Sequence, residues 1–406
     1  MIDIEGKSGL KYLMFGSLYF SEGLEYALAV VIVPVYLVDK GFSLALTTLI
    51  AGAVMAPWML KFIFGGVVDY FSPLGRKRFI LLGGVMGVSG LFAISFIDPS
   101  VSLLLFTLAL LISHCGVVFF DVSADALAIE ISREEERGKI NGAMFAGLFI
   151  GMAAGSSLIG AIADSAGYSV GFFTTGILVL LIIIFPLLVK ENILAKTRQK
   201  VASLLMGEFR KKVMQMVAVF LPISAISYGI LQFAVPLYMK TTLDLNIATI
   251  GLITALFPAA NVVGALVGGA TTDKWGRKQN IYLFMILLSL FSALLVVATS
   301  WQRLAVLYGI VGFVHGGFYA AIGALLMDVT NPKIGATQYS LLTSLANFGE
   351  MGAGTATGAL ISAIGFGRVF LISGWIYGPA LLIFYFVRYG IQIPFVQSKK
   401  EVKDAA

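Results

Sequence analysis

The sequence predicts an all-α membrane protein in which twelve transmembrane helices form two pseudo-symmetric bundles of six. Composition supports the membrane class, because 59% of the 406 residues are hydrophobic and only 12% are charged, against about 25% in an ordinary soluble domain. Apolar runs of about 20 residues recur along the whole chain, and each can cross a hydrocarbon core of about 30 Å as a helix. The second half of the sequence then repeats motifs of the first.

The predicted spans follow one another with short polar connections. They cover residues 12–38, 44–68, 79–97, 101–130, 139–163, 169–189, 213–239, 247–272, 280–299, 303–330, 337–362 and 368–388. A polar stretch separates the sixth span from the seventh. The sequence therefore predicts an N-terminal bundle over residues 1–189, a cytoplasmic linker over residues 190–212 and a C-terminal bundle over residues 213–406.

Positive charge sets the predicted orientation. When both termini are placed in the cytoplasm, most of the 28 Lys and Arg residues fall in cytoplasmic segments, and only Lys61 falls inside a span. This asymmetry follows the positive-inside rule. We therefore expect a multi-pass protein of the cytoplasmic membrane, embedded in lipid as a monomer, and we interpret the net charge of +6 as a topology signal rather than a nucleic-acid site.

Other classes of chemistry lack the residues that they need. Cys115 is the single cysteine, and no His and Cys residues have the spacing of a metal site, so neither a disulfide nor a bound metal is expected. A complete phosphate-binding loop and a catalytic nucleophile are also missing from the sequence. We therefore predict no cofactor and no enzymatic activity.

Several anchors align the two halves at nearly one offset. The segment "PVYLVDK" at Pro34 corresponds to "PLYMKTT" at Pro236, and "SHCG" corresponds to "VHGG", which places His114 on His315. The segments "ALAIE" and "ALLMD" pair Glu130 with Asp328. A duplicated six-helix unit of this kind is typical of transporters whose site lies between the halves near the membrane midplane.

The most specific motif is a glycine, three residues, an aspartate and then a Gly-Arg-Lys turn, and it occurs twice. The glycine lets neighbouring helices approach closely, the aspartate lies at a helix end where it can pair with an arginine, and the basic turn stays in water. A solvated loop is the alternative, but the recurrence favours a conformational latch on the cytoplasmic side. The predicted latch residues are Gly65, Asp69, Gly75, Arg76 and Lys77 after span 2, Gly269, Asp273, Gly276 and Arg277 after span 8, and Glu130, Arg137 and Asp328 near the ends of spans 4, 5 and 10.

The repeated motif resembles the loop signature of the major facilitator superfamily, and its second copy matches closely. The first copy has about three extra residues before Gly75. The chain also resembles the branch that contains muropeptide permeases (AmpG) and acetyl-CoA transporters. Three segments carry this resemblance: "LKFIFGGVVDYFSPLGRKR", "DVSADALAIE" and "ATQYSLLTSLANFG". The resemblance implies the major facilitator fold and alternating access, but no particular substrate, because members of this branch carry chemically unlike cargoes.

Span 4 carries ionisable residues inside the membrane, where each is costly and suggests a function. His114, Asp121 and Asp125 follow helical spacing and lie on one face. Two carboxylates four residues apart repel each other when both are ionised, which favours a shared proton. The alternative is that both aspartates belong to a purely structural hydrogen-bond network.

Spans 1 and 2 add further charges. Glu22 and Glu25 lie on one face of span 1, and Lys61 in span 2 is a candidate counter-ion for one of the carboxylates. Two alternatives remain open: Lys61 can reach the cytoplasmic surface with its long side chain, and span 1 can begin one turn away from its predicted position.

The second half is built differently at these positions. Ile322 and Leu326 stand where the first half has its two aspartates. We expect the first half to handle protons chiefly and the second half to share in orienting the substrate through hydrogen-bonding groups. The polar residues inside its spans are Tyr228, Gln232, Asn261, His315, Tyr319, Asn347 and Glu350.

These patterns predict a proton-coupled secondary transporter that moves a small organic solute by rocking two six-helix halves. Its partners are then the small-molecule substrate, protons and the lipid bilayer. Two alternatives stay open. One is a multidrug exporter of lipophilic cations that works by proton antiport, and the other is a non-transporting assembly or sensor protein on the same fold.

Overall fold

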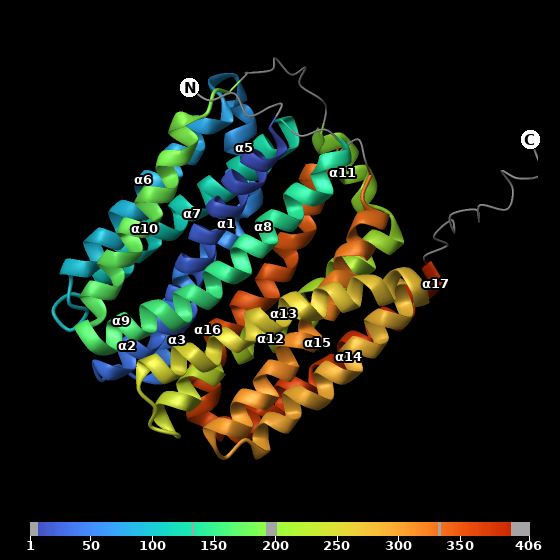
Figure 1. The fold of residues 1–406 in the computed structure, drawn as a ribbon. Coiled ribbons are helices and arrows are strands. Elements are labelled where there is room, and N and C mark those ends of the chain that lie inside the picture. Colours follow the sequence, from blue (N-terminus) through green and yellow to red (C-terminus); the bar gives the residue numbers. More distant parts are fainter. Residues whose placement is uncertain (1–6, 132–133, 192–200, 332–333, 391–406) are drawn as a thin grey trace, which may run out of the picture.

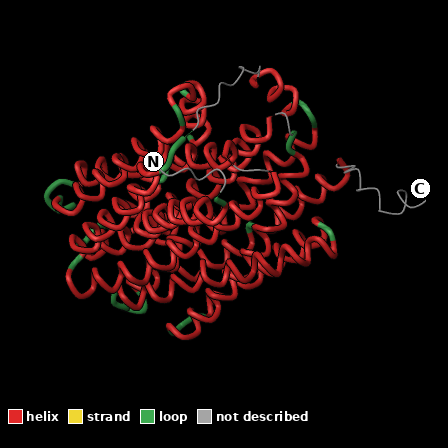
Figure 2. The backbone as a smooth tube through the Cα atoms, turned by 45° about the horizontal axis from the view of Figure 1, so that its top comes forward, coloured by secondary structure: helices red, strands yellow, loops and turns green. Residues whose placement is uncertain are grey.

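The computed structural model describes residues 7–131, 134–191, 201–331 and 334–390. These residues form helices joined by short loops, with no strand in the described part (Figure 2). The first half of the chain lies on one side of the molecule and the second half on the other, and the helices of both run in roughly the same direction (Figure 1).

The first half contains six crossings. Their helices are α1 (Ser8–Ala27), the π-helix η1 (Leu28–Ile32) and α2 (Val33–Asp39); α3 (Leu44–Val54), α4 (Ala56–Met59) and α5 (Lys61–Tyr70), with the short η2 (Ser72–Leu74); α6 (Arg76–Phe96); α7 (Leu103–Ile131); α8 (Glu134–Ala154), the π-helix η3 (Gly155–Ile159) and α9 (Gly160–Ala166); and α10 (Tyr168–Leu188).

The second half also contains six crossings, after a short helix in the predicted linker. They are α11 (Val201–Phe209) in the linker, then α12 (Lys212–Thr241), α13 (Ile247–Trp275), α14 (Arg277–Leu294) with η4 (Leu295–Val297), α15 (Trp301–Val329), α16 (Gly335–Trp375) and α17 (Tyr377–Gly390).

Three of the predicted spans differ in form from separate, simple helices. Ten helical stretches in the described residues are long and apolar enough to cross a membrane, and the second predicted span is not among them because it is broken into α3, α4 and α5. The last two predicted spans share one stretch, in which Gly365 adopts a φ of +79° and turns the chain. The break and the turn reconcile these ten stretches with twelve crossings.

Glycine allows the closest helix contacts within each half. α1 packs on α8, where a Cβ on Gly147 would lie 2.0 Å from Gly16 O. α12 packs on α16 in the equivalent place, where a Cβ on Gly349 would lie 1.8 Å from Pro222 O. Any larger residue at these positions would force the helices apart.

The most extensive contacts between the halves involve α16 and α13 of the second half. α3 packs against α16, and α8 with η3 and α9 packs against α13. At the first contact, the Thr48 hydroxyl lies 3.0 Å from both Thr355 O and Gly358 N, donating to the carbonyl and accepting from the amide. Hydrogen bonds to backbone atoms therefore connect the two halves directly.

Two turn glycines explain part of the repeated loop motif. Gly75 and Gly276 precede α6 and α14 with φ values of +89° and +91°. This left-handed region is unfavourable for residues with a Cβ. The glycine of the Gly-Arg-Lys turn is therefore required by the backbone itself.

Candidate functional site

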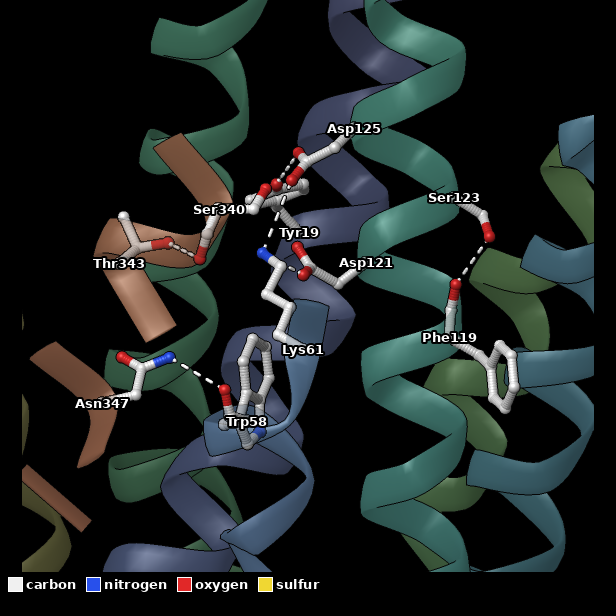
Figure 3. A network of polar contacts seen from close by, with 10 residues as sticks. All are labelled: Tyr19, Trp58, Lys61, Phe119, Asp121, Ser123, Asp125, Ser340, Thr343 and Asn347. Atoms are coloured by element: carbon white, nitrogen blue, oxygen red, sulfur yellow. Dashed lines mark hydrogen bonds and ion pairs between the residues drawn. The ribbon is translucent and has the colours of Figure 1, made fainter. Parts of the chain in front are cut away.

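A charged cluster lies inside the first half, between α1, α5 and α7 (Figure 3). The Lys61 ammonium forms an ion pair with Asp121 and lies 3.5 Å from Asp125 Oδ2. The Tyr19 hydroxyl donates a hydrogen bond to the other carboxylate oxygen of Asp125. The Asp121 side chain is 2% exposed and that of Asp125 is 37% exposed, so the cluster extends from the protein interior to an accessible surface.

Glu22 belongs to the same cluster. It is buried, and Asp121, Lys61 and Asp125 are the charged groups that act on it. The cluster therefore holds three carboxylates and one lysine. If all four groups were ionised, it would carry two uncompensated negative charges in a largely buried place.

The break in the second crossing positions Lys61. α4 ends at Met59 and α5 begins at Lys61, so the ammonium extends from the first residue of a new helix. Trp58 O lies at this break, and the Asn347 amide of α16 donates to it at 3.2 Å (Figure 3). Asn347 is thus a contact between the halves, made to irregular backbone of the kind that is tolerated in membranes only inside protein.

Two predicted members of the first-half cavity lie elsewhere. Glu25 points towards α6 and α7, where the Ser113 hydroxyl donates to it at 2.6 Å and Gly87 leaves room for it. His114 is buried, and its Nδ1 lies 3.2 Å from Leu110 O in its own helix. The structure thus does not bring Glu25 to the cluster of Glu22, or His114 to the aspartates. The three-residue spacing leaves Glu22 and Glu25 about 60° apart around the helix, and the seven-residue spacing leaves His114 about 10 Å from Asp121 along it.

A second polar network joins the two halves. The Tyr26 hydroxyl of α1 lies 2.7 Å from both Gln232 Oε1 of α12 and Glu350 Oε1 of α16. It can donate its one proton to only one of these two acceptors at a time. Gln232 Nε2 donates to Glu350 at 3.3 Å. Tyr228 lies next to both Tyr26 and Glu350.

Aromatic rings of the second half extend from this network. Tyr228 stacks on His315 with ring centroids 4.5 Å apart and on Phe257 at 5.4 Å, and Phe257 contacts Tyr308 at 5.1 Å. Asn261 Nδ2 lies 2.9 Å from His315 Nδ1. We call Tyr228, Phe257, Tyr308 and His315 the aromatic wall.

A small cavity of about 20 Å³ lies between the aromatic wall and the first half. Tyr228, Phe257, Tyr308 and Gln232 line it on one side. The opposite side is formed by residues of α1, η1, α8 and η3. The second polar network thus lies beside a cavity between the repeats, the region in which transporters with duplicated bundles commonly hold their substrate.

The first latch is an arginine with several partners. Arg76 Nε lies 3.2 Å from Glu130 Oε1, and Nη1 donates to Val68 O at 2.9 Å. Glu191, at the start of the predicted linker, accepts hydrogen bonds from the backbone amides of Arg76 and Lys77 at 2.5 and 3.2 Å. This carboxylate lies at the N-terminus of α6, where negative charge is favourable. The Lys77 ammonium donates to Leu187 O in the last turn of α10 and to Val189 O just after it.

The second latch repeats the first. Arg277 Nε lies 2.6 Å from Asp328 Oδ2, so the pairing of Glu130 with Asp328 in the aligned repeats corresponds to two equivalent ion pairs. A Cβ on Gly65 would meet only Val122, at 3.6 Å, and one on Gly269 would meet nothing within 4 Å. The side chains of Asp69, Arg137 and Asp273 lie outside the described part of the structure.

Polar contacts between the halves also gather at the end formed by α2, α3 and α9, the lower end in Figure 1. Asp39 Oδ1 lies 2.5 Å from Lys240 Nζ, and the Asn246 amide donates to Asp164 at 3.1 Å. The latch ion pairs at the opposite end each stay within one half. Among the described residues, the halves are therefore tied by ion pairs only at the end away from the termini.

Sequence reasoning missed several tyrosines of the two networks. Tyr19 and Tyr26 flank Glu22 at the spacing i−3 and i+4, so one stripe of α1 faces both networks. This spacing is readable from the sequence once Glu22 is chosen. Tyr339 also faces the Lys61 cluster, from the second half, as does Tyr319, which was predicted as a polar residue of that half but not as a neighbour of the cluster.

Comparisons with known proteins agree with this architecture. The chain matches the Major Facilitator Superfamily over residues 15–223 and 216–404. An uncharacterized protein of Haemophilus influenzae is 29% identical over 402 residues, which cover 91% of this chain and 92% of that protein. The anhydromuropeptide permease of Escherichia coli is 24% identical over 341 residues, which cover 80% of this chain and 69% of the permease.

Solved structures share the fold. The nucleoside transporter NupG superposes with a TM-score of 0.73 at 13% identity and covers 94% of this chain and 99% of its own. A bacterial homologue of the human lysosomal transporter Spinster, in an inward-facing and unoccupied conformation, gives a TM-score of 0.75 at 13% identity, with 94% and 97% coverage. The chain belongs to the Major Facilitator Superfamily of transporters and resembles its muropeptide permease branch.

Proposed function

We propose that this protein is a proton-coupled secondary transporter that moves a small organic solute by alternating access. The observation that carries the proposal is the buried cluster in which Lys61 is surrounded by three carboxylates. The moving units are residues 1–189 and 213–406, joined by the linker 190–212. The protein works as a monomer in the cytoplasmic membrane, with both termini in the cytoplasm.

The charge balance of the cluster supports proton coupling. A buried charge without a partner costs several kcal/mol, and one lysine compensates only one of the carboxylates Glu22, Asp121 and Asp125. Taking up a proton removes part of this cost. Because Asp125 is the accessible member, protons enter and leave the cluster through it.

The contacts between the halves support alternating access. The halves are tied at the end away from the termini by the Asp39–Lys240 ion pair and by Thr48. The positive-inside rule places that end outside the cell, so this arrangement is closed to the outside. The latches of Arg76 and Arg277 hold each half rigid at the cytoplasmic end while the halves separate there.

The first step of the test is to identify a solute that the protein binds. A thermal-shift screen of the purified chain against a metabolite library, repeated at two pH values, identifies a ligand by its stabilisation of the folded state. Uptake of that ligand is then measured in proteoliposomes with an imposed pH gradient. The wild type accumulates the ligand, and Asp125→Asn inserts normally but loses the pH-driven part of uptake.

A matched control separates coupling from general damage. Glu208→Gln removes a carboxylate from α11, outside the crossings, and keeps full pH-driven uptake. Undiminished gradient-driven uptake by Asp125→Asn would remove Asp125 from the coupling mechanism, and the absence of any pH dependence in the wild type would contradict proton coupling.

A further inference from the structure

We propose that Glu350 binds the positive charge of an aromatic organic cation, whose body lies against the aromatic wall. This inference rests on the proposed transport function, because it names the class of solute that the protein carries. It concerns the second polar network and not the Lys61 cluster.

The hydrogen-bond partners of Glu350 in the described part of the chain carry no positive charge. Its partners are the Tyr26 hydroxyl at 2.7 Å and the Gln232 amide at 3.3 Å, both neutral. Among the described residues, no lysine or arginine forms an ion pair with Glu350, and Lys61 is engaged with Asp121 and Asp125. A ligand that brings a positive charge would complete this site.

The surroundings of Glu350 suit an aromatic cation. Tyr228 lies beside the carboxylate and continues into the stacked rings of Phe257 and His315. Ring faces attract cations through their quadrupole, and the attraction grows when water is excluded. Flat apolar rings also bury well against them.

A further acceptor lies behind the wall. Asn261 is 2% exposed, its amide nitrogen contacts His315, and its Oδ1 has no hydrogen-bond partner in the described part of the chain. An unsatisfied buried carbonyl is costly. It also adds negative potential on the side of the wall, which favours a cationic ligand over an anionic one.

Binding at Glu350 would also act on the contact between the halves. Tyr26 belongs to α1, whereas Gln232 and Glu350 belong to α12 and α16. A cation at the carboxylate competes with the Tyr26 hydroxyl for Glu350 Oε1. Binding of the cation therefore weakens the hydrogen bond between Tyr26 and Glu350, which connects the two halves in this structure. The cavity of about 20 Å³ then widens to admit the solute.

The experiment measures equilibrium binding to the purified full chain with two probes of one shape and opposite charge. Radiolabelled tetraphenylphosphonium is the cation and tetraphenylborate is the anion. The wild type binds the cation saturably and at least tenfold more tightly than the anion. Glu350→Gln lowers the affinity for the cation at least tenfold, and Tyr228→Leu lowers it several-fold.

Glu25→Gln is the matched control, because Glu25 is also a buried membrane carboxylate but faces Ser113, away from both networks. It binds the cation with wild-type affinity. Glu350→Asp keeps the negative charge and retains measurable binding. Its binding shows that a change at position 350 does not by itself unfold the protein. No saturable cation binding by the wild type, equal affinity for the anion, or unchanged affinity in Glu350→Gln would each overturn the proposal.

The measurement uses no ion gradient, so its outcome is separable from that of the transport experiment. If the expected binding is found but pH-driven uptake is absent, the proposal of proton coupling is wrong and the proposed cation site is supported. If pH-driven uptake of another solute is found and the binding pattern fails, the cation site alone is wrong.

Discussion

The contact between α5 and α7 in the first half and the contact between α13 and α15 in the second come from equivalent parts of the repeat, yet one is charged and the other is glycine-packed. Lys61 bridges α5 to Asp121. Aligning the glycine and aspartate of the two loop motifs places Ala265 at the position of Lys61, and a Cβ on its neighbour Gly264 would lie 1.8 Å from Phe313 O. A lysine needs the space that glycine removes.

The difference continues along the same helices. The second crossing is broken at Leu60, whereas α13 runs unbroken from Ile247 to Trp275. The first half also contains the π-helices η1 and η3 beside the cavity, while α12 is a regular helix of 30 residues. Irregular helices of this kind often mark functional sites. One copy of the repeat thus contains the buried Lys61 cluster, and the other supports the aromatic wall.

The largest effect is expected from removing the lysine of the cluster. Lys61→Met leaves buried carboxylates without a counter-ion, which costs about 3–5 kcal/mol. Thermal unfolding in detergent should show a strongly lowered Tm, and the double variant Lys61→Met/Asp121→Asn should recover part of the loss.

Lys274→Met removes an exposed lysine near the second latch and serves as the control. A Lys61→Met protein as stable as wild type, or a double variant no better than the single one, would show that the cluster is not held together by its charges.

The next effect compares a glycine at a close helix contact of the second half with a glycine of the first half. Gly268→Ala places a Cβ 2.4 Å from Gly317 Cα, whereas Gly65→Ala meets only Val122 at 3.6 Å. Overpacking typically costs about 1–3 kcal/mol. We expect Gly268→Ala to lower the Tm clearly and Gly65→Ala to change it little; equal Tm values would contradict the glycine-packed description of the second half.

A smaller effect is expected at the outer ion pair between the halves. Lys240→Met removes the partner of Asp39, and an exposed pair contributes about 0.2–1 kcal/mol. This corresponds to a shift of up to roughly fivefold between the two states. Electron-resonance distances between spin labels at Val101→Cys and Gln302→Cys, in a Cys115→Ala background, should show more of the outward-open form.

Lys40→Met is the matched control for that experiment. Lys40 pairs with Asp98 at 2.5 Å within the first half and lowers the pKa of the Asp98 carboxyl by its hydrogen bond. Its loss should leave the distance distribution unchanged. If both lysine variants shifted the distribution equally, the outer pair would have no special part in closing the halves.

The smallest effect concerns the linker helix α11. Hydrogen bonds from Lys211 and Asn331 hold the pKa of the Glu208 carboxyl below its usual value. Because the folded-state pKa is lowered, this contact stabilises α11 fully above the ordinary glutamate range, and the contribution is lost as pH falls through the lowered value.

Amide hydrogen exchange over residues 201–209, corrected for intrinsic rates, should therefore show weaker protection at acid pH in the wild type. Glu208→Gln should show the weaker protection already at neutral pH. Equal protection of both proteins at every pH would mean that Glu208 does not hold the helix.

The fold could be predicted because the hydropathy of the membrane spans and the recurrence of motifs between the halves are both visible along the sequence. Hydropathy located the crossings, and the repeat placed Glu130 and Asp328 in register before their ion pairs with Arg76 and Arg277 were seen. Breaks within crossings were harder to predict, since Pro57 precedes the break at Leu60 whereas Pro258 lies inside the unbroken α13.

The sites were predictable only as far as side chains share a helix face. Asp121 and Asp125 were found by their spacing, but the separation of Glu25 from Glu22 depends on small angular differences around α1 that pattern reading does not resolve. Contacts between distant helices, such as Tyr26 with Glu350, require the three-dimensional arrangement. The identity of the cargo depends on the shape of the open state, which no spacing rule gives.

The most direct test of the account is to observe the proton on the first-half cluster. Infrared difference spectra of the purified protein, recorded between acid and alkaline pH, report the carbonyl stretch of protonated carboxylic acids. We predict a titrating band that loses intensity in Asp125→Asn and gains intensity in Lys61→Met, because loss of the lysine leaves more carboxylates in need of a proton. Spectra that are identical in the wild type and both variants would contradict the claim that this cluster carries the coupled proton.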